Sequence, residues 1–152
     1  MSVFPGFSFR ETMSGIYWRL ETPTEERAIT FTIDAEARSV RRFVRDKTWS
    51  IKGTIDAEGL ATARPLEGTL VFRLLDERRL PYRFSFTGDD GRSYELSGQK
   101  EWSGLAPVAS MTLLPASLYG PDGVELARAT LRFDLRSDLG RWMKSFRLHL
   151  FT

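Results

Sequence analysis

Cysteine is absent from this chain of 152 residues. The chain therefore forms no disulfide, thiolate metal site, thiol nucleophile or cysteine-bound iron–sulfur cluster. A reducing compartment suits such a chain, so we expect a cytoplasmic location. Asparagine is missing too, which removes N-glycosylation acceptors and the Asn-Gly hairpin turn, so the turns should rely on Asp and Gly.

Long apolar runs are also lacking. No segment approaches the ~18 consecutive apolar residues of a membrane helix, and residues 1–10 lack the basic start and apolar stretch of a signal peptide. We therefore expect neither secretion nor membrane insertion.

Neither sign of charge predominates, because the formal net charge is only +2. Four of the 22 Lys and Arg residues are lysine, and the arginine surplus alone is weak evidence for a polyanionic partner. The densest basic cluster comprises Arg38, Arg41, Arg42, Arg45 and Lys47. Acidic neighbours dilute this cluster, and strands carry such charges to prevent edge-to-edge association. We expect no nucleic-acid partner.

Histidine occurs once, at position 149. A single histidine without cysteine does not make the usual structural zinc site, and alternation places His149 opposite an apolar face, at the surface. The chain also lacks the Gly-x-Ser-x-Gly elbow, the Gly-x-Gly-x-x-Gly motif and the Walker loop. The sequence therefore indicates no catalytic residue, no metal and no cofactor.

Period-two alternation of apolar and polar residues dominates what is present, and it is typical of half-buried antiparallel strands. Helical periodicity is almost confined to 137–143, which is either a single capped turn or a loop. The alternating runs number about ten. They cover 7–13, 29–33, 40–45, 49–55, 69–75, 80–86, 94–102, 108–114, 125–135 and 146–150.

Turn signals separate these runs, with Gly59 placed to supply a left-handed residue after 56–58. Further turns are expected at 76–79, 88–91 and 121–123. With no linker, residues 1–152 form a single all-β domain, either an antiparallel β-barrel or a β-sandwich. Short turns that suit an up-and-down meander favour the barrel, and so do Gly53 and Gly98, which lie where a closing sheet bends.

Two charged residues occupy registers that are otherwise apolar. Glu11 lies between Phe9 and Met13, and Lys100 follows Leu96 towards Trp102. If these faces line the interior, each buried charge needs a partner, and the other is the simplest choice. The alternative is that one or both lie near a strand end with their charged groups in solvent.

Aromatic residues are plentiful, with 11 phenylalanines and four tryptophans. They either fill the core or line a cavity for an apolar ligand. For the second case, the expected ligand-binding residues are Glu11, Met13, Trp49, Phe84, Tyr94, Lys100 and Trp102.

Three stretches together resemble a known family: Phe9–Gly15, Pro81–Phe86 with Tyr94–Lys100, and Trp142–Leu148. They are similar to a β-rich region that accompanies bacterial flavin-dependent (GMC-type) oxidoreductases related to cholesterol oxidase. The resemblance implies an accessory module beside a sterol- or alcohol-oxidising enzyme. The architecture also resembles lipocalin-like barrels, which hold small apolar ligands, although their Gly-x-Trp opening is not evident here.

The leading hypothesis is therefore a non-enzymatic, lipocalin-like barrel that binds a small hydrophobic molecule, lipid- or sterol-like, in its interior. The alternative is a protein-interaction module that docks on a separate oxidoreductase or on a second copy of itself. A third hypothesis is an enzyme that uses Glu11 and Lys100 as acid and base.

Overall fold

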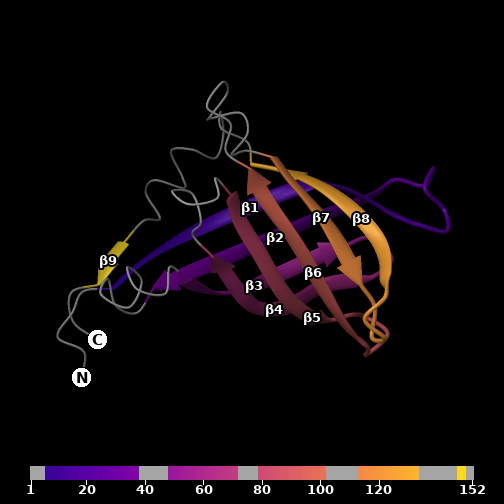
Figure 1. The fold of residues 1–152 in the computed structure, drawn as a ribbon. Helices are drawn as coiled ribbons and strands as arrows, with labels where there is room; N and C mark the ends of the chain where they lie inside the picture. Colours follow the sequence, from indigo (N-terminus) through magenta and orange to yellow (C-terminus); the bar gives the residue numbers. More distant parts are fainter. Residues whose placement is uncertain (1–5, 38–47, 72–78, 102–112, 134–146, 150–152) are drawn as a thin grey trace.

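The computed structural model describes residues 6–37, 48–71, 79–101, 113–133 and 147–149, and all the regular structure within them is β (Figure 1). These described residues contain nine strands. They are β1 (Gly6–Arg19), β2 (Arg27–Ala37), β3 (Thr48–Ala57), β4 (Ala61–Val71), β5 (Arg79–Thr87), β6 (Ser93–Glu101), β7 (Leu113–Tyr119), β8 (Glu125–Arg132) and β9 (Arg147–His149).

Strands β1 to β8 close into one antiparallel barrel. Each strand pairs with the next along the chain, and β8 returns to β1 to complete the ring. This up-and-down order leaves no unpaired sheet edge along the closed part of the ring. The expected barrel is therefore confirmed, and the alternative β-sandwich is not what the chain forms.

The long strand β1 makes this closure possible. It pairs with β2 from Phe7 to Tyr17, and its second half pairs with β8 over Ser14–Arg19. Its first residues pair instead with β9, from Gly6 to Ser8. The short β9 therefore pairs with the same edge of β1 as β8 does, but nearer the start of β1.

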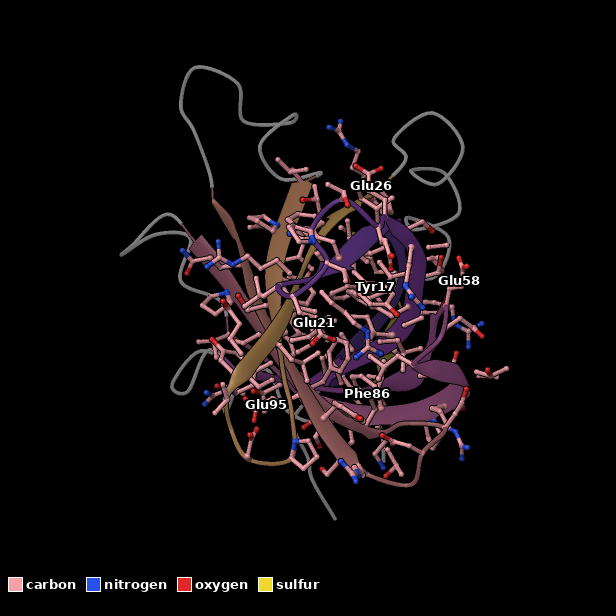
Figure 2. The ribbon with its side chains drawn as sticks, turned by 90° about the vertical axis from the view of Figure 1, so that its right-hand side faces the viewer. Tyr17, Glu21, Glu26, Glu58, Phe86 and Glu95 are labelled. Atoms are coloured by element: carbon pink, nitrogen blue, oxygen red, sulfur yellow. The ribbon has the colours of Figure 1, made fainter. Side chains whose placement is uncertain are left out.

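Alternation along the strands separates a buried interior from a polar exterior, as in β2, where every second side chain from Ile29 to Ala37 is buried. Seen from the right-hand side of Figure 1, the strands ring a packed interior; Tyr17 and Phe86 lie towards its middle, and Glu58 and Glu95 lie at its periphery (Figure 2). The largest fully buried side chains include Tyr17, Tyr82, Phe31, Phe84 and Met13.

Glycine at inward positions lets neighbouring strands approach closely. A Cβ atom on Gly53 would lie 1.8 Å from the backbone oxygen of Thr32. On Gly98 it would lie 2.6 Å from the oxygen of Pro115. These two mid-strand glycines therefore occupy positions that a side chain cannot fill without moving the backbone.

The two ends of the barrel differ. The connections after β1, β3, β5 and β7 lie at one end, which we call the tight-turn end. The expected turns are confirmed there, with positive φ at Gly59, Gly91 and Gly123. Leu60, in the turn between β3 and β4, is buried in the core and helps to fill this end.

The largest differences from the predicted boundaries occur in three strands. Strand β1 runs past Gly15, because this glycine allows the close approach of β8 and does not end the strand. Strand β4 begins at Ala61, not at 69, and β7 runs on to Tyr119, past its predicted end at 114. Each contains a proline, Pro65 or Pro115, whose missing N–H normally argues against a strand.

Several predictions fall outside the described residues. They are the strand at 40–45 with its basic cluster, most of the turn at 76–79, the first part of the strand at 108–114, Trp102, and the helical turn at 137–143. His149 lies in β9, as the strand prediction for 146–150 requires, but its side chain also lies outside the description.

Candidate functional site

The two charged residues expected at inward registers form an ion pair inside the barrel. Lys100 Nζ donates a hydrogen bond to Glu11 Oε1 at 2.7 Å. The side chains of Lys100 and Glu11 are only 5% and 6% exposed, respectively. Both are therefore interior residues, and of the two orientations considered from the sequence the inward one is correct.

Tyr82 completes the cluster. Its hydroxyl donates to the same oxygen, Glu11 Oε1, at 3.0 Å, and its ring lies 5.1 Å from Lys100 Nζ, within range of a cation–π interaction. We call Glu11, Tyr82 and Lys100 the interior polar cluster.

The fold brings these residues together from opposite walls. Glu11 is on β1, and Tyr82 and Lys100 are on the adjacent strands β5 and β6. Strand β5 is the fourth neighbour of β1 in either direction around the ring, so the Tyr82–Glu11 hydrogen bond crosses the barrel interior. Tyr82 lies near the start of β5 and Lys100 near the end of β6, which places the cluster away from the tight-turn end.

The surroundings of the cluster are apolar. Phe9 and Met13 flank Glu11 on the inward face of β1, and the ring of Trp49 packs edge-on against Phe9 with centroids 4.9 Å apart. Burial raises the pKa of Tyr82 well above its ordinary value, and the charge of Glu11 and the hydrogen bond to it act in the same direction. Tyr82 is therefore a neutral hydrogen-bond donor at physiological pH.

The wall beside Tyr82 consists of small residues. Tyr82 pairs with Gly98, Gly98 with Ala116, and Ala116 with Ala129. The ladder between β6 and β7 covers only the four pairs from Glu95–Tyr119 to Gly98–Ala116. This part of the wall contributes little side-chain volume to the interior.

The remaining predicted site residues divide into two groups. Met13, Trp49 and Phe84 are buried in the interior, and Phe84 packs edge-on against Phe31 at 5.2 Å. Tyr94 lies at the tight-turn end, where its hydroxyl donates to Asp90. It stacks on Phe86 at 5.8 Å and does not join the interior polar cluster, so its assignment to the same site is not supported by the geometry.

A second polar network ties the tight turns together. Asp89 accepts hydrogen bonds from the Thr62 hydroxyl at 2.7 Å, the Thr62 backbone nitrogen at 3.0 Å and Arg64 Nε at 2.9 Å. The side-chain hydrogen bonds from Thr62 and then Arg64 are the main causes that lower the pKa of Asp89. These contacts join the β5–β6 turn to β4, so Asp89, Thr62 and Arg64 have a structural role at this end.

A groove of about 480 Å³ lies on the outer face of β5 to β8 and β1. Its lining includes Trp18, Pro81, Ser97, Gln99, Ser117 and Arg128. Gly98, Ala116 and Ala129 also line it, so the groove and the interior polar cluster lie on opposite faces of the same small-residue wall. The guanidinium of Arg128 is paired with Glu125 at 3.1 Å.

The described residues contain neither a candidate metal cluster nor a candidate membrane-spanning helix. Within the described ranges, no three His, Asp or Glu side chains are grouped so as to hold a metal ion. No helix long and apolar enough to cross a membrane occurs in the part of the chain that the structure describes.

Comparison with known proteins does not supply a family. A scan against models of protein families, a search of curated proteins and a search of solved structures each give no match to this chain. The resemblance to the oxidoreductase-associated region therefore stays a prediction from the sequence, and the function has to be argued from the site itself.

Proposed function

We propose that this protein binds a small hydrophobic molecule inside the barrel and catalyses no reaction. The polar group of the ligand contacts Glu11, Tyr82 and Lys100, and its apolar part contacts Met13, Trp49 and Phe84. The observation that carries the proposal is the ion pair buried in an otherwise apolar interior. Small-molecule sites typically combine apolar walls with a few polar groups that fix orientation.

Fold stability is a poor explanation for this ion pair. Removing two charges from water costs several kcal/mol per ion, and well-packed apolar residues in the same place are often as stable or about 1–4 kcal/mol more stable. A barrel that needed only a filled core would be served by apolar side chains at positions 11 and 100. Contact with a ligand explains why a charged pair, and not an apolar one, occupies positions 11 and 100.

The packing supports a ligand position in the half of the barrel that holds the interior polar cluster. The tight-turn end is filled by Tyr17, Leu60 and Phe86, whereas the cluster lies in the other half beside Gly98 and Ala116. Met13, one inward position from Glu11, is unbranched and adapts its shape more readily than the aromatic residues around it. We expect ligand binding to displace Met13 before any aromatic side chain.

Tryptophan fluorescence provides the test, because Trp49 is buried next to Phe9 and Trp18 lines the outer groove. Titration with fatty acids, long-chain alcohols, sterols and aromatic compounds should shift or quench the emission saturably for at least one ligand class. The Trp49→Phe variant should lose most of that change, and the matched Trp18→Phe variant should keep it.

The same measurement can overturn the proposal. No saturable change with any compound, supported by calorimetry that detects no heat of binding, contradicts interior ligand binding. A change that survives in Trp49→Phe but disappears in Trp18→Phe places the ligand on the outer groove, which also contradicts it.

A further inference from the structure

The interior polar cluster has hydrogen-bonding capacity that its own contacts leave unused. A lysine ammonium carries three N–H donors, and among the described residues Lys100 Nζ donates one hydrogen bond, to Glu11 Oε1. That oxygen also accepts a hydrogen bond from the hydroxyl of Tyr82. No described residue donates to the other carboxylate oxygen, Glu11 Oε2. The cluster therefore offers a ligand both donors and an acceptor.

The cluster is also electrically balanced. Glu11 and Lys100 are the buried charged residues of the described chain, and they neutralise each other at 2.7 Å. Tyr82 adds no charge, because its raised pKa keeps it protonated at physiological pH. A ligand that brings its own charge would leave one unit of charge without a counter-ion in an apolar interior, which is costly.

We infer that the ligand is a neutral amphiphile whose polar group is a hydroxyl, that is, an aliphatic or alicyclic alcohol. This inference rests on the proposed interior binding function and narrows its ligand class. A hydroxyl accepts a hydrogen bond from Lys100 Nζ and donates one to Glu11 Oε2. It therefore uses both a remaining donor and the remaining acceptor of the cluster. A ketone or an ester only accepts, and a carboxylate or an amine brings a charge.

Three ligands with the same decyl chain test the inference: decanol, undecanoate and decylamine, each titrated at neutral pH by calorimetry into the full chain. Decanol should bind at least about tenfold more tightly than either charged ligand, a difference of about 1.4 kcal/mol. All three ligands bury the same apolar chain, so the ranking reports on the polar group alone.

Two variants should reverse the ranking. Glu11→Gln leaves the Lys100 ammonium without its counter-ion, so the preference should move to undecanoate. Lys100→Met leaves the Glu11 carboxylate, so the preference should move to decylamine. Lys52→Met is the matched control, since Lys52 is 76% exposed on the outside of β3 and its loss should leave the ranking of the wild type unchanged.

The outcomes separate the inference from the function on which it rests. Binding of decanol as the tightest ligand, with reversal in the folded variants, supports the inference. Tighter binding of undecanoate or decylamine to the wild type overturns it and leaves interior binding in place. No binding of any of the three overturns both. The ranking for the wild type decides the question even if circular dichroism shows that a variant does not fold.

Discussion

The buried ion pair leads to a prediction about stability that needs no knowledge of the ligand. Lys100→Met leaves the Glu11 carboxylate in the interior with Tyr82 as its hydrogen-bond donor, and Glu11→Met leaves the Lys100 ammonium beside the Tyr82 ring. Breaking a buried pair by removing one partner costs about 3–5 kcal/mol. We expect each single variant to lose that much free energy of unfolding.

The distance between the charges supports this magnitude. At 2.7 Å, and with an effective dielectric constant of about 20, the attraction between Lys100 and Glu11 is about 6 kcal/mol. A variant that lacks one partner loses this attraction but no longer bears the cost of desolvating that partner. The saved desolvation cost offsets only part of the lost attraction. In contrast, Lys52 and Glu67 are 3.9 Å apart and both more than 70% exposed, so Lys52→Met should stay within about 0.5 kcal/mol of the wild type.

Urea unfolding at neutral pH measures these differences, with the triple variant Glu11→Met, Tyr82→Phe and Lys100→Met completing the comparison. This apolar variant should be as stable as the wild type within about 1 kcal/mol, or more stable. A Lys100→Met variant as stable as Lys52→Met would contradict the expected cost of breaking the buried pair. A triple variant that loses as much stability as a single one would contradict the expectation that apolar side chains can replace the cluster, because the cluster would then stabilise the fold by itself.

Two further predictions concern the same interior. The raised pKa of Tyr82 favours the neutral phenol in the folded state, so the contribution of Tyr82 to stability is complete below the unfolded-state pKa of about 10 and is lost as the pH rises above that value. Urea unfolding at increasing alkaline pH should therefore show a steeper decline in stability for the wild type than for Tyr82→Phe. Equal slopes for the two proteins would contradict the assigned burial of Tyr82. Gly53→Ala should lower the unfolding free energy by about 1–3 kcal/mol, because its Cβ would lie 1.8 Å from a backbone oxygen. Gly91→Ala, which meets no atom within 4 Å, tests the cost of positive φ alone, and thermal unfolding of both variants separates the two effects.

The sequence was sufficient for the all-β class and the barrel, because alternation is local and each strand pairs with its neighbour in the chain. It was also sufficient for the turns at Gly59, Gly91 and Gly123, since these positions need a left-handed residue. The start of β4 and the end of β7 were predicted wrongly, and both strands continue through a proline, Pro65 or Pro115. Pairing with neighbouring strands keeps both segments extended despite the missing N–H groups.

The site was only partly predictable for a related reason. Glu11 and Lys100 were recognisable from their registers, because a charge in an apolar register is visible in the sequence. Tyr82 was missed because a tyrosine in an apolar register looks like an ordinary core residue. Its role depends on which strands face each other across the barrel. The same information places the hydroxyl of Tyr94 at Asp90, apart from the interior polar cluster.

The most direct test of interior binding is to locate a bound alcohol by NMR, using protein labelled at the methionine methyl groups and decanol as the ligand. Met13 is fully buried next to Glu11, so its methyl group should show nuclear Overhauser effects to the alkyl chain of decanol. The indole of Trp18, in the outer groove, should show none. Contacts to Trp18 without contacts to Met13 would contradict the account.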